Sequence, residues 1–251
     1  STRRDMVSDE WADEFEKLQS DCPKIAYEDI RSQLELSFPE KVDEIFSSID
    51  KKPLAAASMA QAHAAVLKDG TEVVIKVLRP QIREIIASDM DALRLLAKFA
   101  KSHLPNMGLD PVEAVEEFAR ELERETDLTN EGRATERLSK MFEDDDTVNF
   151  PIIYWDATTK DVLCETHVTG MLLAGLDPNT LPDETRRSIV RNGARAVFHQ
   201  TLDVGFFHAD PHPGNIFVQE NGNIIFIDCG MTGFVDEETR MHIAELVYGV
   251  T

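Results

Sequence analysis

One eight-residue stretch restricts the possible folds of this chain more than any other. It reads His-Ala-Asp-Pro-His-Pro-Gly-Asn and occupies residues 208–215. Two prolines and a glycine fix one particular non-helical path, which an ordinary surface turn rarely requires. The apolar residues 205–207 before it indicate that the loop is anchored in a core. The stretch therefore predicts a rigid loop at a functional site.

Within this loop, the carboxylate of Asp210 and the amide of Asn215 stand in the pattern D-x-x-x-x-N. In kinase catalytic loops this spacing places a base and a magnesium-binding amide on one loop. The two histidines of the loop have a spacing that suggests zinc ligation from a helix, but the prolines argue against that helix. We therefore expect a histidine that supports the loop through hydrogen bonds.

Two further residues complete a set suited to phosphoryl transfer. Asp228 follows the apolar run 224–227 and precedes Cys229 and a glycine. Packing explains a carboxylate at the end of a buried strand poorly, so we interpret it as a magnesium ligand, with Cys229 a small buried apolar residue. Lys76 ends the run Val-Val-Ile-Lys, where a buried lysine is costly unless it is paired; alone, it could equally reach solvent from a strand edge. The set predicts binding of ATP with Mg2+ and action on the γ-phosphate.

Apolar periodicity predicts the helices. They are expected in short segments within residues 1–50 (with Trp11, Phe15 and Leu18, then Ile30 and Leu34, at helical spacing), and over residues 80–103, 110–142 and 183–203. Asp110-Pro111 supplies a cap and first-turn residue for the long helix. Its stripe of Val112, Val115, Phe118 and Leu122 is expected to be buried, and its other face is acidic.

Strands are predicted between these helices. Residues 61–67 and 71–78 form an expected hairpin across Asp69-Gly70, and residues 216–218 and 224–227 form a second across Asn221-Gly222. Residues 152–155 and 162–166 are expected as two more strands.

The order of elements indicates an α+β, two-lobed protein-kinase-like fold, with a small β-sheet and helices in the N-lobe and a mainly helical C-lobe. We expect an N-terminal helical extension at 1–50, the N-lobe at 51–166 and a partial C-lobe at 167–251. The chain looks truncated at both ends.

Composition narrows the partners. The 251 residues contain 26 Lys and Arg against 47 Asp and Glu, for a formal net charge of -21. This charge repels nucleic-acid phosphates, so nucleic acid is not expected as a partner. The three cysteines lack paired or zinc-type spacing and fit a reducing compartment. No apolar run is long enough to span a bilayer.

Several segments occur in a set order along the chain. They are residues 1–5, the alanine-rich stretch 55–63, the lysine strand 73–76 with Arg79-Pro80, Glu125-Thr126-Asp127 with Glu131, and the loop 208–215 with Asp228-Cys229-Gly230. With this set the sequence resembles, over its whole length, the UbiB/ADCK family of atypical kinases, which support coenzyme Q (ubiquinone) biosynthesis. The family's K-x-G-Q motif, which residues 1–5 would follow, is absent, so a more open cleft is expected.

The resemblance implies a role for each matching residue in the N-terminal half. The alanine-rich loop, which replaces the usual glycine-rich loop over ATP, comprises Ala55, Ala56, Ala57 and Ser58. Because alanine takes positive φ less freely than glycine, this loop should be stiffer; without the family it reads as a short buried strand or a helix start. Lys76 would contact the α- and β-phosphates.

Glu131 would hold that lysine, and Glu125 with Asp127 would form the regulatory E-x-D motif. On composition alone these three acids read as a solvated helix face.

In the C-terminal half, Asp210 would be the base or water-positioning carboxylate, and Asn215 and Asp228 would bind Mg2+. Glu165, Thr166 and His167 would form the hinge whose backbone meets adenine.

The implied function is an ATPase or small-molecule kinase of isoprenoid-quinone synthesis that binds ATP or ADP. Quinone precursors, a membrane surface and quinone-biosynthesis proteins are the implied partners. The expected location is the cytoplasm or the periphery of the inner membrane in a bacterium, and a mitochondrion or plastid in a eukaryote.

Two alternatives stay open. A small-molecule kinase of the aminoglycoside or choline kinase type shares the loop, although the alanine-rich stretch and Glu125-Thr126-Asp127 count against it. A nucleotide-sensing scaffold would bind ADP without turnover, using nearly the same residues.

Overall fold

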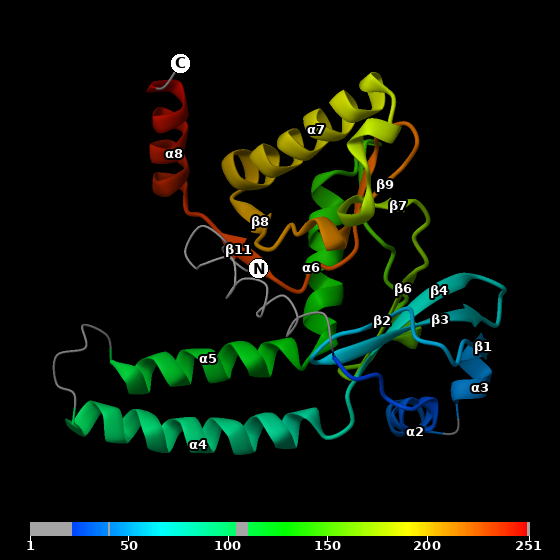
Figure 1. The fold of residues 1–251 in the computed structure, drawn as a ribbon, viewed down its shortest axis with the longest axis vertical. Helices are drawn as coiled ribbons and strands as arrows, with labels where there is room; N and C mark the ends of the chain where they lie inside the picture. Colours follow the sequence, from blue (N-terminus) through cyan, green and yellow to red (C-terminus); the bar gives the residue numbers. More distant parts are fainter. Residues whose placement is uncertain (1–21, 40, 104–109, 250–251) are drawn as a thin grey trace. The chain divides into compact units, whose positions relative to one another are not determined.

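The computed structural model describes residues 22–39, 41–103 and 110–249 (Figure 1). The described residues form two compact units: the N-terminal unit contains those up to residue 130 and residues 155–164, and the C-terminal unit contains residues 131–154 and those from residue 165 onward. The lobe boundaries expected after residues 50 and 166 stay predictions, and the units differ from them in grouping 131–154 with the C-terminal half. The expected helix around Trp11 and the segment 1–5 lie outside the described residues.

A five-stranded sheet organises the N-terminal unit. Its strands follow the order β1-β3-β4-β6, and β2 pairs with β3. Their bounds are β1 Phe46–Ile49, β2 Ala55–Ala56, β3 Ala60–Leu67, β4 Glu72–Leu78 and β6 Val162–Thr166. The expected hairpin across Asp69-Gly70 is confirmed as β3 and β4, whereas the helices expected throughout residues 1–50 give way to strand β1.

The two faces of this sheet differ in burial. Along β3 and β4, one face carries six buried residues, namely Gln61, His63, Ala65, Val73, Ile75 and Val77. Helix α2 (Tyr27–Ser37) contributes the fully buried Ile30 and Leu34 to the core of this unit. On the opposite face, which carries Lys76, most residues are only half-buried. Because side chains alternate along a strand, the buried face positions the lysine on the accessible one.

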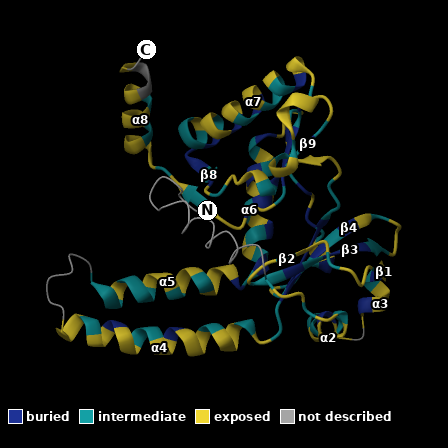
Figure 2. Cartoon of the chain, viewed as in Figure 1, coloured by how far each residue is buried: buried dark blue, intermediate teal, exposed yellow. Residues whose placement is uncertain are grey.

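Helices α4 (Ile82–His103) and α5 (Pro111–Glu125) pack against each other, and α3 (Val42–Ile45) precedes β1. Asp110 caps α5 by accepting a hydrogen bond from the Val112 amide at 2.9 Å, as its sequence signal predicts. The prediction of a buried stripe on α5 is wrong: no residue of α5 is buried, and Phe118 is 52% exposed (Figure 2). Helical periodicity identifies an apolar stripe, but burial depends on what packs against it.

The single helix expected over residues 110–142 is also wrong, because Thr126 and Asp127 divide it into α5 and α6 (Leu128–Met141). Asp127 accepts hydrogen bonds from the backbone and hydroxyl of Thr129, at 3.1 and 2.6 Å. An aspartate that bonds the amide two residues ahead starts a new helix. Arg83 donates to the Thr126 carbonyl at 2.5 Å and fixes the break.

The C-terminal unit contains a four-stranded sheet of order β5-β10-β9-β7 and a two-stranded sheet of β8 and β11. The bounds are β5 Val148–Asn149, β7 Met171–Leu172, β8 Phe206–His208, β9 Ile216–Val218, β10 Ile224–Phe226 and β11 Thr232–Phe234. The hairpin expected across Asn221-Gly222 is confirmed as β9 and β10. The strand expected at 152–155 is wrong: only Ile153 forms a bridge, with Glu165, and Trp155–Ala157 is a 3-10 turn of the N-terminal unit.

Helices complete this unit. The expected helix at 183–203 is α7 (Asp183–Phe198), extended by a π-helical turn at His199–Val204 and ended by Gly205 in the left-handed region. Helix α8 spans Glu237–Gly249, and short 3-10 turns lie at Leu173–Gly175, Pro178–Thr180 and Pro213–Asn215. Among the described residues, no helix is long and apolar enough to span a membrane.

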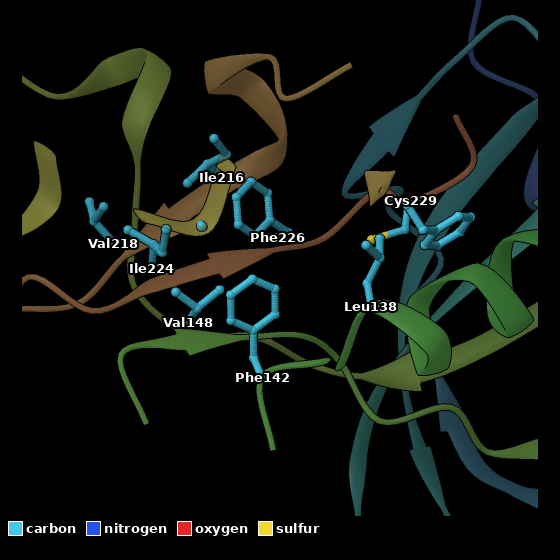
Figure 3. Close-up of a cluster of buried hydrophobic side chains, with 10 residues drawn as sticks. Leu138, Phe142, Val148, Ile216, Val218, Ile224, Phe226 and Cys229 are labelled. Atoms are coloured by element: carbon cyan, nitrogen blue, oxygen red, sulfur yellow. The ribbon is translucent and has the colours of Figure 1, made fainter. Parts of the chain in front are cut away.

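One apolar cluster connects the elements of the C-terminal unit (Figure 3). Phe226 from β10 and Leu138 from α6 are almost fully buried in it, and Cys229 is fully buried beside them. The prediction of Cys229 as a small buried apolar residue is therefore confirmed. Because β10 and Cys229 both belong to the core, the intervening Asp228 is held at a fixed position.

Candidate active site

The predicted loop is fixed by hydrogen bonds from its two histidines. His208 Nδ1 accepts from the Asp210 amide at 3.2 Å, and His212 Nδ1 accepts from the Gly214 amide at 3.0 Å. These bonds confirm the prediction of histidines that support the loop. They also place Asp210, which is half-buried, two residues after His208, a histidine buried in the core.

His208 is 6% exposed, and burial lowers its pKa, opposed by the carboxylates of Asp228 and Asp210. Because its Nδ1 accepts a hydrogen bond, the neutral ring carries its proton on Nε2. The backbone amide of His208 donates to Gln200 Oε1 at 2.8 Å. Gln200 is 2% exposed and was missed by sequence reasoning; a polar residue among the apolar positions of the helix before the loop was the available signal.

The two predicted magnesium ligands lie at the open end of the β9–β10 hairpin. Phe226 pairs with Ile216, and beyond them the Ile227 amide donates to the Asn215 carbonyl at 3.0 Å. Asp228 is the next residue, so Asn215 and Asp228 lie beside each other at the same end of adjacent strands. Asp228 is exposed and Asn215 is half-buried, so both are accessible to a bound group.

Glu131 lies close to the same end of the hairpin. A Cβ atom added to Gly230 would stand 3.4 Å from Asp228 Oδ1 and 4.0 Å from Glu131 Oε2. Both carboxylates therefore border the backbone of Gly230. Two neighbouring carboxylates repel each other unless a cation lies near them. The C-terminal unit thus brings together Glu131, Asn215 and Asp228, with Asp210 on the adjoining loop.

In the N-terminal unit, strand register places the predicted phosphate lysine beside the alanine-rich segment. Ala62 pairs with Ala55 on one side and with Lys76 on the other. Directly paired residues point to the same face, so these three side chains share the accessible face of the sheet, and Ala55 and Lys76 lie about 10 Å apart across two strand spacings. Figure 1 shows β2, β3 and β4 side by side.

The alanine-rich segment is a strand and a turn. Ala55 and Ala56 form β2, with Ala55 exposed and Ala56 half-buried, so the buried strand expected from composition alone is only partly correct. The Ala57 amide donates to the Ala60 carbonyl at 2.9 Å and closes a turn that leaves Ala57 and Ser58 exposed. Among the described non-glycine residues, only Gln81 has positive φ, so this turn needs no glycine.

The other predicted residues are more dispersed. Glu125 is exposed at the end of α5, while Asp127 caps α6. Glu165 is buried at 3% exposure near the end of β6, and the Thr166 amide donates to the Ile152 carbonyl at 2.9 Å. His167 follows, half-buried. Lys76 and Glu131 belong to different units, and their pairing stays a prediction.

An α+β chain with a lysine on a sheet strand, a rigid Asp/Asn loop and a carboxylate directly after a hairpin is a protein-kinase-like protein. The chain belongs to the ABC1 atypical kinase-like domain family, which matches residues 17–251. The expected family and fold class are thereby confirmed.

Named relatives agree with this assignment. A probable protein kinase UbiB of Pseudomonas putida is 36% identical over 99% of this chain and 47% of its own length. The chloroplastic protein ACTIVITY OF BC1 COMPLEX KINASE 7 of Arabidopsis thaliana is 34% identical over 100% of this chain and 36% of its own length. The chain therefore spans less than half the length of these curated relatives.

A solved structure supports the fold independently. Rv3197 of Mycobacterium tuberculosis, determined in complex with erythromycin, superposes with a TM-score of 0.71. It is 23% identical, and the match covers 92% of this chain and 58% of that one.

Proposed function

We propose that this chain binds ATP or ADP with Mg2+ and acts as a kinase-like phosphotransferase or ATPase. The observation that carries the proposal is the placement of Asn215 and Asp228 at the same end of the β9–β10 hairpin, with Glu131 beside Gly230. Magnesium in such sites is held by one or two protein oxygens and by substrate phosphates. Asn215 and Asp228 supply the protein oxygens, and the phosphates of the nucleotide supply the rest.

Each remaining residue has a chemical task in this proposal. Asp210, held half-buried by the His208 bond, accepts the proton of the attacking hydroxyl or water. Lys76 supplies positive charge to the α- and β-phosphates from the accessible face of the sheet, next to the alanine-rich turn. The amides and carbonyls around Glu165 and His167 meet the adenine.

The acceptor and the location belong to the same proposal. The resemblance favours isoprenoid-quinone synthesis, here ubiquinone, at a membrane surface, either the inner membrane of a bacterium or that of a mitochondrion or plastid. Release of phosphate from ATP, measured with and without a quinone-precursor lipid in liposomes, tests this role. Nucleotide binding without turnover, unchanged by Asp210→Asn, would favour the nucleotide-sensing scaffold instead.

Nucleotide binding itself is tested by thermal-shift titration with Mg-ADP. Asp228→Asn removes the charge of a magnesium ligand and should abolish the magnesium-dependent part of the stabilisation, while Glu143→Gln, an exposed acid in a turn of the same unit, should not. Lys76→Ala should abolish stabilisation by nucleotide, and the exposed Lys68→Ala is its control. Full magnesium-dependent stabilisation of the Asp228→Asn variant would remove that residue from the site.

A further inference from the structure

Arg79 joins the alanine-rich turn to the start of the described chain. It directly follows β4, and its Nε donates to the Ala57 carbonyl at 2.8 Å. A terminal nitrogen of the same guanidinium donates to the Pro23 carbonyl at 2.9 Å. The Arg79 backbone amide adds a bond to the Met59 carbonyl, also at 2.9 Å. One residue thus holds both sides of the turn and the segment before α2.

The path of the chain after Arg79 supports this geometry. Pro80 follows, and Gln81 has a φ of 59°, in the left-handed region. A long side chain in that region costs on the order of 1 kcal/mol. The strained residue lies in the turn that leads from β4 into α4, immediately after the guanidinium that reaches the alanine-rich turn. The surrounding structure therefore fixes the direction in which the backbone leaves the sheet after Arg79.

Gln61 holds the same segment from the buried face of the sheet. It is 1% exposed; its Oε1 accepts from the Ile25 amide at 2.9 Å, and its Nε2 donates to the Ile25 carbonyl at 3.2 Å. Ala56 of the alanine-rich strand pairs with this residue. The bonds of Gln61 therefore link Ile25 to β3, the strand that pairs with Ala56 of β2.

His63 completes the network. Gln61 Nε2 lies 2.9 Å from His63 Nε2, and His63 Nδ1 lies 2.7 Å from the Asp50 carbonyl. An amide nitrogen only donates, so His63 Nε2 accepts and Nδ1 carries the proton that is donated to Asp50. Both side chains are buried with their hydrogen bonds made, and such satisfied networks specify one rigid arrangement.

We propose that Arg79 and Gln61 are positioning residues that fix the alanine-rich turn, residues 57–60, before nucleotide binds. A glycine-rich loop gains its close contacts to phosphate from backbone freedom. The alanines of this turn lack that freedom, and the side chains of Arg79 and Gln61 set the position of the turn instead. Preorganisation of this kind increases affinity because less order has to be imposed on binding. The inference rests on the proposed function, in which this turn covers the nucleotide.

The first test needs no nucleotide. Hydrogen exchange of peptides covering residues 22–27 and 55–62 is compared between the wild type, Arg79→Ala and Arg79→Lys. We expect faster exchange in both segments for Arg79→Ala and an intermediate effect for Arg79→Lys, because one ammonium cannot reproduce the fork of the guanidinium. Exchange over residues 73–77 should not change, and Arg120→Ala, an exposed arginine of α5, should alter neither segment. Unchanged exchange at 55–62 in Arg79→Ala would overturn the proposal.

The second test measures the affinity for Mg-ADP by calorimetry. Arg79→Ala should weaken binding roughly tenfold, with Arg79→Lys between it and the wild type and Arg120→Ala equal to the wild type. Gln61→Ala should act in the same direction through residues 22–27. Faster exchange with unchanged affinity would overturn the positioning role. A wild-type chain that binds no nucleotide would refute the proposed function and this inference with it, and is recognised before any variant is compared.

Discussion

The two glycine turns of this protein allow a strict test of how much a neighbouring helix constrains a hairpin. Gly70 and Gly222 have similar φ values, 91° and 84°. A Cβ atom at Gly70 would meet no atom within 4 Å, whereas one at Gly222 would stand 2.6 Å from Ser188 Cβ on α7. Substitution by alanine therefore imposes the same backbone strain at both positions and a steric clash at only one.

The magnitude follows from these contacts. Alanine at positive φ costs roughly 1–2 kcal/mol, and this should be the whole effect of Gly70→Ala. At Gly222 the hairpin and α7 must also separate by about 0.8 Å to raise the 2.6 Å contact to the 3.4 Å of ordinary contact. That movement disrupts the bond from Asn192 Nδ2 to the Gly222 carbonyl, 2.9 Å long and buried. Losing it adds about 1–3 kcal/mol, for an expected total of about 2–5 kcal/mol.

Equilibrium urea denaturation followed by circular dichroism measures both free energies of unfolding. A double-mutant cycle then isolates the clash: Ser188→Gly removes the opposing Cβ and should recover about 1 kcal/mol or more of the Gly222→Ala loss. Ser188→Ala keeps that atom and should recover nothing. Equal losses at Gly70 and Gly222, or additive effects in the cycle with Ser188→Gly, would refute this reasoning.

Three further outcomes are expected. Asp127→Ala should lower the free energy of unfolding by about 1 kcal/mol, because the cap of α6 is lost, and Asp127→Ser should retain most of it; equal losses would show that the cap is not the cause. Leu138 is fully buried in the C-terminal core, so Leu138→Ala should lower the free energy of unfolding by about 2–5 kcal/mol. Val190 is 71% exposed, so Val190→Ala should lower it by under about 1 kcal/mol. The midpoints of urea denaturation measure both effects. Burial would raise the pKa of Asp145, but hydrogen bonds from Thr147 and the charge of Arg195 outweigh it and hold the pKa below its usual range. The stability that Asp145 contributes is therefore present at neutral pH and lost as pH falls through the lowered pKa. At pH 7 the wild type should have a larger free energy of unfolding than Asp145→Asn, and this difference should shrink below about pH 4. A difference that stays constant with pH would contradict this sign.

Local signals in the sequence predicted the local structure around most of the candidate site residues. Asp210 and Asn215 lie on a loop whose prolines exclude a helix, and Asp228 follows a hairpin that the turn residues Asn221-Gly222 predict. Each of these inferences uses residues that are close in sequence. The conformation was therefore recoverable without knowing what packs against it.

Features that depend on distant residues were not recoverable. Phe118 repeats with helical spacing, yet nothing among the described residues covers it sufficiently to bury it. The break at Thr126 contains no glycine or proline, so periodicity continues across it. The bonds of Arg79 to Pro23 and Gln61 to Ile25 join residues 56 and 36 positions apart. A single sequence contains no pattern from which such long-range hydrogen bonds can be predicted.

The placement of the cysteines makes the two units separately observable. Cys164, in the N-terminal unit, and Cys229, in the C-terminal unit, are each fully buried, whereas Cys22 is partly accessible. A thiol reagent can modify a buried cysteine only when the surrounding structure opens. Mass spectrometry of peptides labelled under native conditions would therefore report the opening of each unit from its own cysteine, without any introduced probe. Nucleotide added to the same reaction would reveal which of the two units it stabilises.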